Sequence, residues 1–237
     1  MSLKYETVLL KISGEALKGD SEIYDEAALE GVGKQIVSLA KEGLRIGIVV
    51  GGGNIWRGKM GQAMKMPQID ADYMGMLATM MNALALETTI SRLGYTKVVV
   101  YSALETRNIS DPYSYREARA KLSAGYIVIF AAGTGYSYFT TDTGAAIRAI
   151  EIGADALMMA KNGVAGVYDS DPKLNPNAKI YKKLTHKDIT DRDLRVMDLT
   201  AATLARDGKL KIEVFDMQGP NNIVKVMHNE LPSTIIE

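Results

Sequence analysis

The segment RIGIVVGGGNIWRG spans residues Arg45 to Gly58 and carries the strongest signal for the architecture of the chain. Its first part, Arg45 to Val50, is a short apolar run rich in β-branched residues, which is typical of a buried strand. Three glycines follow directly, and consecutive glycines are tolerated where a group must approach the main chain closely or φ must be positive. We predict a strand that ends in an anion-binding turn, with Arg57 as a bidentate partner for phosphate. A flexible turn with a surface arginine is the alternative.

The same alternation of short apolar runs and longer helical patterns extends along the chain in both directions. A helix is indicated where apolar residues recur at spacings of three and four, at Leu29, Val32, Ile36 and Leu39. Strands are expected at Thr7–Ile12, Arg45–Val50, Lys97–Tyr101, Tyr126–Ala131, Ala156–Ala160 and Lys211–Phe215. Further helices are expected at Asp72–Leu93, Tyr113–Ser123, Thr143–Ile152, Leu194–Arg206 and Asn221–Asn229. This order is typical of βαβ units, so we predict an α/β fold with a mainly parallel central sheet.

Length, composition and charge limit the class of protein. The chain has 237 residues, of which 47% are hydrophobic, and it has no Cys. A chain of this length buries roughly 70–75% of its unfolded surface and needs no disulfide or structural zinc. The 28 Lys+Arg balance the 28 Asp+Glu, which argues against a nucleic-acid binder with a basic face. The first residues do not resemble a secretory signal, and no apolar run approaches the roughly 18 residues that span a bilayer. We expect one cytoplasmic domain that binds neither membrane nor nucleic acid.

Two further loops follow predicted strands. The first, KISGE at Lys11 to Glu15, places a lysine beside a glycine backbone, which suits a phosphate, although such a segment is more often only a turn. The second, GTGYSYFTTD at Gly133 to Asp142, offers hydroxyls, aromatic rings and a carboxylate ahead of a helix, where helix capping is the alternative role for Asp142. Because ligands of open α/β sheets bind at the carboxyl ends of strands, we expect all three loops to meet there.

Two common nucleotide-binding motifs are disfavoured. Neither KISGE nor GGGNIWRG matches GxxxxGK[ST]. In GGGNIWRG, Trp56 stands where the third glycine of GxGxxG would be. The segment of residues 162–177, NGVAGVYDSDPKLNPN, is rich in turn residues, and we interpret it as a functional loop and not as a domain boundary.

One predicted helix is unusual because Tyr73 to Leu86, YMGMLATMMNALAL, has no charge and is apolar nearly all round. It is too short to span a membrane. An amphipathic surface helix keeps a polar face, so this pattern indicates burial on both sides, in the central core or against another copy of the chain. We predict a subunit interface.

Together these loops resemble those of the amino acid kinase superfamily, and within it those of the bacterial uridylate kinases. Four more motifs support the resemblance, namely ADYMGMLAT at Ala71–Thr79, MAKNG at Met159–Gly163, GVYDSDP at Gly166–Pro172 and VMD at Val196–Asp198. The resemblance covers essentially the whole chain. KISGE and the glycine turn are shared across the superfamily, whereas ADYMGMLAT and the GTG…FTTD loop are specific to the uridylate kinases.

The resemblance implies a fold, a reaction and an assembly. The fold is a three-layer αβα sandwich like that of carbamate kinase, with an acceptor-binding lobe at residues 1–155 and an ATP-binding lobe at residues 156–237. The reaction is transfer of the γ-phosphate of Mg·ATP to UMP, giving UDP and ADP in pyrimidine nucleotide synthesis. The assembly is a homohexamer, and relatives respond to GTP and UTP, for which no residue is assigned here.

The resemblance also implies site residues. The ATP phosphates are expected at Lys11, Ile12, Ser13, Gly14, Gly53 and Arg57, and the ATP base and ribose at Asn162, Tyr168 and Asp171. UMP is expected at Gly52, Asp72, Thr134, Gly135, Tyr136, Ser137, Tyr138, Phe139, Thr140 and Thr141. The catalytic set is Lys11, Arg57, Asp142 and Lys161. Mg²⁺ is held mainly through the ATP phosphates, with Asp142 orienting the lysines or contacting the metal. Relatives carry Asn-Pro or Ser-Pro where this chain has Tyr136-Ser137.

These residue types suit phosphoryl transfer, which depends on positioning and on charge neutralisation. No general base is evident, and none is required, because a UMP phosphate oxygen is already anionic near neutral pH. The two histidines, His186 and His228, are interpreted as surface or packing residues. Asp72 suits ribose hydroxyls, with a helix N-cap as its alternative role. Three hydroxyls are candidates for distinguishing uracil from cytosine, those of Thr134, Thr140 and Thr141.

Two other functions stay open. Another enzyme of the superfamily would phosphorylate a carboxylate or a carbamate. A protein of a different class would bind nucleotides as a sensor without turnover.

Overall fold

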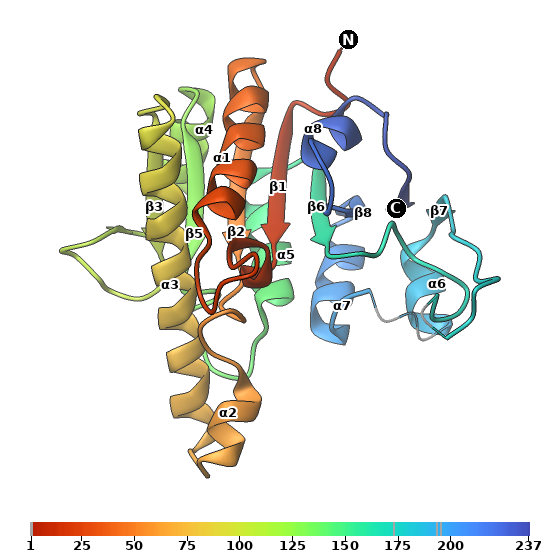
Figure 1. Ribbon diagram of the computed structural model, residues 1–237, viewed down its shortest axis with the longest axis horizontal. Coiled ribbons are helices and arrows are strands. Elements are labelled where there is room, and N and C mark those ends of the chain that lie inside the picture. Colours follow the sequence, from red (N-terminus) through yellow and green to blue (C-terminus); the bar gives the residue numbers. More distant parts are fainter. Residues whose placement is uncertain (1, 173, 193, 195) are drawn as a thin grey trace.

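A computed structural model describes residues 2–172, 174–192, 194 and 196–237. Within these residues nine strands form one sheet, in the order β4-β3-β5-β2-β1-β6-β8-β9-β7 (Figure 1). The strands are β1 (Thr7–Ile12), β2 (Arg45–Val50), β3 (Val98–Ser102), β4 (Asp111–Pro112), β5 (Ile127–Ala131), β6 (Ala156–Lys161), β7 (Lys183–Leu184), β8 (Ile212–Asp216) and β9 (Ser233–Ile236). Pairing is parallel from β4 across to β8, and β9 runs antiparallel to β8. The prediction of a mainly parallel sheet is confirmed.

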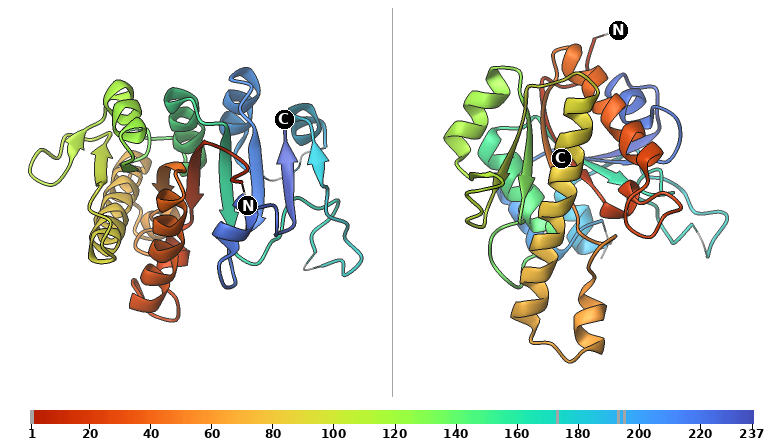
Figure 2. Two further views of the ribbon diagram at one scale, coloured as in Figure 1. Left: turned by 90° about the horizontal axis from the view of Figure 1, so that it is seen from above. Right: turned by 60° about the vertical axis from the view of Figure 1, so that its left-hand side comes forward.

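Helices cover both faces of the sheet. They are α1 (Glu26–Lys41), α2 (Gly58–Ala63), α3 (Gln68–Arg92), α4 (Tyr115–Ser123), α5 (Thr141–Ile152), α6 (His186–Asp191), α7 (Leu199–Asp207) and α8 (Asn222–Met227), with a short 3₁₀ helix, η1, at Gly14–Leu17. The view along the sheet in Figure 2 shows α1, α3 and α8 on one face and α4, α5, α6 and α7 on the other. The molecule is therefore a three-layer αβα sandwich.

Each face of the sheet has its own hydrophobic core. Strand β1 shows why, because its alternate residues point to opposite faces: Leu10 packs in the cluster under α1 and α3, and Leu9 packs in the cluster under α5 and α7. A strand buried on both faces is continuously apolar, as TVLLKI nearly is. The polar end of β1, Lys11, is thereby carried to the carboxyl edge of the sheet.

The expected elements are largely present, and their boundaries differ where a cap decides them. Strands β1 and β2 begin and end where predicted. Helix α7 begins at Leu199 and not at Leu194, because the Asp198 side chain accepts a hydrogen bond from the Ala201 backbone N–H. Helix α3 begins four residues earlier than expected, directly after Pro67. Residues 195 and 173, inside the expected helix and the expected loop respectively, lie outside the described residues.

Several short elements were not predicted from sequence, namely η1, α2, α6, β4, β7 and β9. All of these have two to six residues, so they offer too few positions for a periodic pattern. Strand β9 extends the sheet by pairing with β8, a contact between distant segments that local pattern cannot indicate.

The apolar helix expected at Tyr73 to Leu86 lies inside α3 and buries only one of its faces within this chain. Its inner face includes Met76, Met80 and Ala83, which are buried. We call Ile69, Tyr73, Leu77 and Met81, together with Met74, the outer stripe; these side chains are 38–51% exposed. Burial in the core of this chain therefore explains the apolar residues of the inner face but not those of the outer stripe. Within the described residues, none of the helices combines the length and apolar character needed to cross a bilayer.

Candidate functional site

The three predicted loops meet at the carboxyl edge of the sheet. Lys11, at the end of β1, forms an ion pair of 3.0 Å with Asp142, at the start of α5. The glycine turn that follows β2 lies against both other loops, since a Cβ built on Gly51 would stand 3.5 Å from the Gly14 nitrogen and 3.9 Å from the Thr141 hydroxyl. The prediction that these segments converge is confirmed.

The glycine turn has a packing reason that the sequence did not reveal. None of Gly51, Gly52 and Gly53 has a positive φ. A Cβ on Gly52 would stand 2.9 Å from the Gly75 carbonyl oxygen and 2.9 Å from the Ala78 Cβ, so a side chain there would collide with α3. A Cβ on Gly53 would have its nearest neighbour at 3.9 Å. Only the middle glycine is therefore demanded by the fold.

A fully buried side chain of α3, Asn82, braces the glycine turn. Its amide nitrogen donates to the Gly51 carbonyl at 2.7 Å, and the side chain also pairs with Asn54. A Cβ on Gly14 would stand 2.5 Å from that same carbonyl oxygen, so the turn, the start of η1 and α3 pack without spare room. Asn82 was missed from sequence because it lies in an apolar run without a motif of its own.

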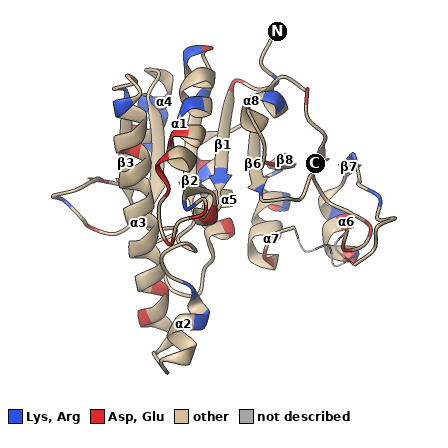
Figure 3. Cartoon of the chain, viewed as in Figure 1, with Lys and Arg blue, Asp and Glu red and all other residues tan. Residues whose placement is uncertain are grey.

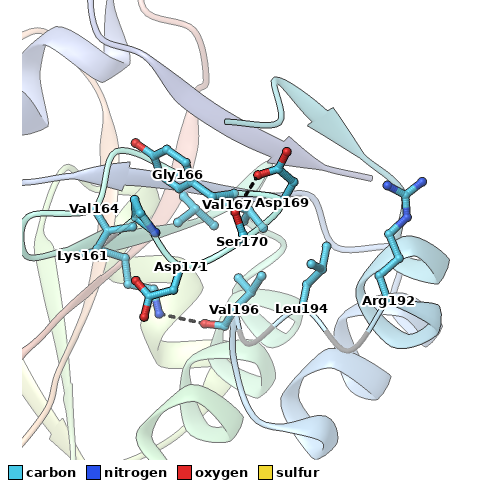
Figure 4. Close-up of a pocket in the computed structure, with 13 residues that line it drawn as sticks. Lys161, Val164, Gly166, Val167, Asp169, Ser170, Asp171, Arg192, Leu194 and Val196 are labelled. Carbon is cyan, nitrogen blue, oxygen red and sulfur yellow. Dashed lines mark hydrogen bonds between the residues drawn. The ribbon is translucent and has the colours of Figure 1, made fainter. Parts of the chain in front are cut away.

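Lys161, at the end of β6, joins Lys11 and Asp142 in one electrostatic cluster. Burial lowers the pKa of the Lys161 ammonium below its ordinary value, the charge of Lys11 lowers it further, and Asp142 opposes both effects. The ammonium donates to the Val196 carbonyl oxygen at 2.7 Å, as Figure 4 shows. Two lysines and one carboxylate thus leave a net positive charge at the centre of the strand edge.

The alternative capping role for Asp142 is wrong, because Thr140 is the N-cap of α5. The Thr140 hydroxyl accepts from the backbone N–H groups of Asp142 and Thr143, at 3.1 and 3.2 Å. It also donates to the Asp198 carboxylate. Since its proton is used there, Thr140 has little left with which to read a base. The Asp142 side chain is instead directed to Lys11.

A cavity of about 310 Å³ opens between α3 and the Gly133–Asp142 loop. It is lined by residues expected to contact UMP, namely Gly52, Asp72, Thr134, Tyr136, Phe139, Thr140 and Thr141. Gly53 lines this cavity too, although the resemblance places it at the ATP phosphates. Gly135, Ser137 and Tyr138 are not among the lining residues. Trp56, Gly75, Met76 and Thr79 are, and sequence analysis assigned them no role.

The alternative role of Asp72 as a helix N-cap is also wrong, because α3 begins at Gln68 and Asp72 lies one turn inside it. Its carboxylate accepts from the Tyr138 backbone N–H at 2.8 Å and from the Gln68 amide at 2.6 Å. Asp72 therefore holds the loop over the cavity as well as lining it.

A second cavity, of about 530 Å³, lies between the end of β6 and residues 164–172 (Figure 4). Tyr168, Asp171 and Lys161, all expected near ATP, line it, whereas Asn162 does not. Apolar side chains from three separate segments form much of its wall, namely Val164, Val196 and Val214. These residues were not predicted, because apolar residues from separate segments have no common spacing in the sequence. An apolar wall of this kind suits a nucleotide base.

Arg57 is exposed, is paired with an acidic side chain and lines neither cavity. It is the N-cap residue of α2, its side chain is 60% exposed, and it forms an ion pair with Glu15. Figure 3 shows basic residues on α2, next to the acidic residues at the lower end of α3. A side chain this exposed can turn toward a ligand phosphate only by leaving Glu15. The other residues expected at the ATP phosphates line neither cavity. They lie at the carboxyl edge of the sheet and are Lys11, Ile12, Ser13 and Gly14.

Among the described residues, no group of three His, Cys, Asp or Glu side chains could hold a metal ion by itself. Asp142 offers one carboxylate next to the lysine cluster. A single carboxylate added to phosphate oxygens and waters fits Mg²⁺, which keeps several waters in most nucleotide sites. His186 and His228 line neither cavity.

A sequence model of the Amino acid kinase family matches residues 6–216, so the chain belongs to this family. Among its relatives, a protein named Uridylate kinase from Mesoplasma florum is 69% identical over 237 residues, with 100% of both chains covered. Another protein with that name, from Mycoplasma capricolum, is 63% identical with the same coverage. The crystal structure of UMP kinase from Ureaplasma parvum is similar with a TM-score of 0.94 and 39% identity, over 99% of this chain and 100% of that one.

Proposed function

We propose that the chain is a UMP kinase that transfers the γ-phosphoryl group of Mg·ATP to UMP, giving UDP and ADP. The observation that carries this proposal is that the cluster of Lys11, Lys161 and Asp142 adjoins both cavities. Lys161 lines the larger cavity, and Asp142, which pairs with Lys11, directly follows Thr141 of the smaller cavity. Two nucleotides bound in these cavities would bring their phosphates to the cluster. Full-length identity of 69% to a relative named Uridylate kinase supports UMP as the acceptor.

On the ATP side, the base would occupy the larger cavity, against Tyr168, Asp171 and the lining valines. Asn162, which follows Lys161 in the sequence, would contact the nucleotide from outside that lining. The triphosphate would run toward the backbone groups of Ile12, Ser13 and Gly14 and toward the ammonium groups. Lysine ammonium groups and glycine N–H groups bind phosphate as point charges and as backbone donors. Arg57 would complete this binding after exchanging Glu15 for phosphate.

On the UMP side, Asp72 would accept bonds from the ribose hydroxyls, and the loop from Thr134 to Thr141 would surround the base. Thr141 is better placed than Thr140 or Thr134 to distinguish uracil from cytosine, because the Thr140 hydroxyl donates to Asp198 and the Thr134 hydroxyl donates to the Tyr136 carbonyl oxygen. A site whose buried polar groups match one base rejects another by leaving those groups unpaired.

The chemistry needs little from the protein beyond placement and charge. An oxygen of the UMP phosphate attacks the γ-phosphorus in line, and the bond from that phosphorus to the bridging oxygen of ADP breaks. Lys11 and Lys161 neutralise charge on the transferring group, and Asp142 keeps the two ammonium groups apart and oriented. Mg²⁺ bound with ATP would supply further charge neutralisation, and Asp142 is the residue that would contact it.

We also propose the division into an acceptor lobe, residues 1–155, and an ATP lobe, residues 156–237, within one domain. It is supported by the lining residues, since those of the smaller cavity lie between positions 52 and 141 and those of the larger between 161 and 214. We propose a cytoplasmic location as well, because UMP and ATP are available there.

The proposed assembly is a homohexamer in which the outer stripe of α3 contacts a second copy of the chain. Its residues Ile69, Tyr73, Leu77 and Met81 recur every four positions, so they form one continuous apolar ridge. An exposed ridge of this kind on a globular chain marks an interaction surface.

The test is a panel of nucleoside monophosphates with ATP and Mg²⁺, with UDP and ADP measured by chromatography. We expect UMP to be phosphorylated at least about 10²-fold faster than CMP, the discrimination typical of a polar site. Turnover of acetylglutamate, glutamate, aspartate or carbamate in place of UMP would indicate another reaction of the family. Binding of UMP without any UDP formation would indicate a nucleotide sensor.

A further inference from the structure

A charged side chain is buried beneath the Gly133–Asp142 loop, outside both cavities. Arg148, in the second turn of α5, is 7% exposed. Burial of a charge is costly unless the charge is paired and its hydrogen-bonding groups are satisfied. The contacts of Arg148 therefore show what the fold gains from placing a guanidinium there.

Two side chains, Glu151 and Tyr113, hold the Arg148 guanidinium. One terminal nitrogen donates to the Glu151 carboxylate at 2.7 Å, and the Tyr113 ring lies 3.6 Å from the guanidinium carbon. The Tyr113 hydroxyl donates to the same Glu151 carboxylate at 2.5 Å, so each of the three side chains contacts the other two. Burial, and then the bond to Glu151, raises the pKa of the Tyr113 hydroxyl, so it stays a donor at physiological pH. The guanidinium is thus fixed in direction.

The other terminal nitrogen points to the loop and donates to the Gly133 carbonyl oxygen at 3.3 Å. Gly133 lines the smaller cavity and precedes Thr134. An ion pair with Glu151 alone would not require this second contact. The geometry hence links a rigid charged group in the core to the root of the loop.

The first residues of this loop, Ala132 and Gly133, which we call the loop root, have an unusual backbone that needs such support. Ala132 and Gly133 both have positive φ, 61° and 56°, and a left-handed conformation is unfavourable for alanine. From the opposite side, the Thr79 hydroxyl accepts from the Ala132 N–H at 2.9 Å. Helices α3 and α5 therefore hold two neighbouring residues, Ala132 through its N–H and Gly133 through its carbonyl group.

We propose that Arg148 is a positioning residue for the phosphate acceptor, acting through the Gly133 carbonyl to fix the loop that surrounds UMP. Clamped by Tyr113 and Glu151, it sets the direction in which Thr134 and the following residues leave the sheet. This inference rests on the proposed function, because it concerns the acceptor cavity of that reaction.

The test compares Arg148→Lys with Glu151→Gln. Lysine keeps a cation near Glu151 but has no second N–H group at the end of a planar fork, so the bond to Gly133 is lost. Glutamine removes the charge of the pair and leaves an oxygen that can still accept from Arg148 and Tyr113. The first variant removes the contact with the loop, whereas the second keeps that contact and weakens the core.

We expect Arg148→Lys to raise the KM for UMP about tenfold, the size of one hydrogen bond from a charged donor, and to leave the KM for ATP within about twofold. Glu151→Gln should leave both KM values within about twofold and lower only the melting temperature. Tyr113→Leu, which removes the ring clamp and keeps the cation, should raise the KM for UMP in the same direction by less. It provides the comparison if Arg148→Lys does not fold.

Hydrogen exchange separates this inference from the proposed function, because it needs no activity. Amides of residues 133–139 should exchange faster in Arg148→Lys than in the wild type or in Glu151→Gln. Unchanged exchange would overturn the positioning role even if the wild type makes UDP. Equal increases in both KM values, or faster exchange with an unchanged KM for UMP, would also overturn it. A wild type that makes no UDP from UMP would refute the proposed function instead.

Discussion

Lys11 is the single residue on which the proposed chemistry depends most. It lies one residue before the end of the central strand β1, and its ammonium is largely buried beside Asp142, which directly follows Thr141 of the smaller cavity. A cation at this point favours the transition state more than either bound nucleotide, since negative charge builds up there during transfer.

Replacing Lys11 by alanine should therefore lower kcat by about 10²–10³-fold with the fold retained. Steady-state kinetics and circular dichroism would measure the two effects. Lys34→Ala is the matched control, because Lys34 is an exposed lysine of α1 paired only along its own helix. Wild-type turnover in Lys11→Ala would remove this residue from the mechanism.

Lys161 should give the reaction a pH dependence of its own. Its pKa lies below the ordinary value, chiefly because the group is buried. As pH rises through that lowered pKa the ammonium loses its proton and its attraction for phosphate, so kcat/KM for ATP should fall at a lower pH than for an ordinary lysine.

The Lys161→Arg variant checks this assignment, because a guanidinium stays protonated throughout the accessible range. Its activity should be lower, but the profile of kcat/KM for ATP should be flat where the wild type falls. The same alkaline fall in both proteins would assign it to a different group.

For single residues, the chemical roles were easier to predict from the sequence than the positions of the side chains. The motif residues Lys11, Asp142 and Lys161 meet as predicted, because strand ends of a parallel sheet share one edge. The alternative roles of Asp72 and Asp142 as helix caps are wrong, because Thr140 and Asp198 cap α5 and α7 and Asp72 lies inside α3. A carboxylate near a helix start has two plausible roles, and only the position of its partner decides between them.

Among the elements, β8 and β9 carry a buried charge that ties both ends of the chain to the sheet. Glu213 of β8 is fully buried and accepts from the Lys4 ammonium at 2.7 Å, the Tyr5 hydroxyl at 2.9 Å and the Ser233 hydroxyl at 2.6 Å. Since all its partners are donors, the carboxylate is stable as an anion only while they are present.

Lys4→Met should thus lower the free energy of unfolding by about 3 kcal/mol, the loss expected when one member of a buried pair is removed. A denaturant titration measures this, and kcat should not change. The control is Lys183→Met, whose lysine forms an exposed pair with Glu237 and should cost at most about 1 kcal/mol. Equal stability of the two variants would contradict the account of Glu213.

Long elements were predictable and short ones were not, for a physical reason. A strand buried on both faces and a helix of four turns repeat their pattern often enough to be recognised, as β1 and α1 do. Strand β9 exists because β8 provides an edge, and α2 because Gly61 lets it approach α3, where a Cβ would stand 2.7 Å from the Ala71 Cβ. Both depend on contacts between segments.

For the whole molecule, the outer stripe of α3 connects assembly to the site. The same helix that exposes Leu77 and Met81 braces the glycine turn with Asn82 and the loop root with Thr79 on its inner face. A second copy packed on this helix would therefore also steady the acceptor cavity.

Leu77→Glu should break the assembly, because a charge buried at the centre of an apolar contact has no partner. Light scattering at micromolar concentration should give the mass of six chains for the wild type and a smaller species for the variant. Leu199→Glu, on the exposed start of α7, should keep the wild-type mass. A monomeric wild type would contradict the interface.

The central proposition is that UMP and ATP bind end to end across the Lys11 cluster. It can be examined by calorimetry with a linked dinucleotide in which uridine and adenosine share one chain of five phosphates. We predict that one molecule binds per chain, that it displaces both UMP and ATP, and that Lys11→Ala weakens it about tenfold or more. Displacement of only one nucleotide, or binding of two linked molecules per chain, would show that the two cavities do not form a single site.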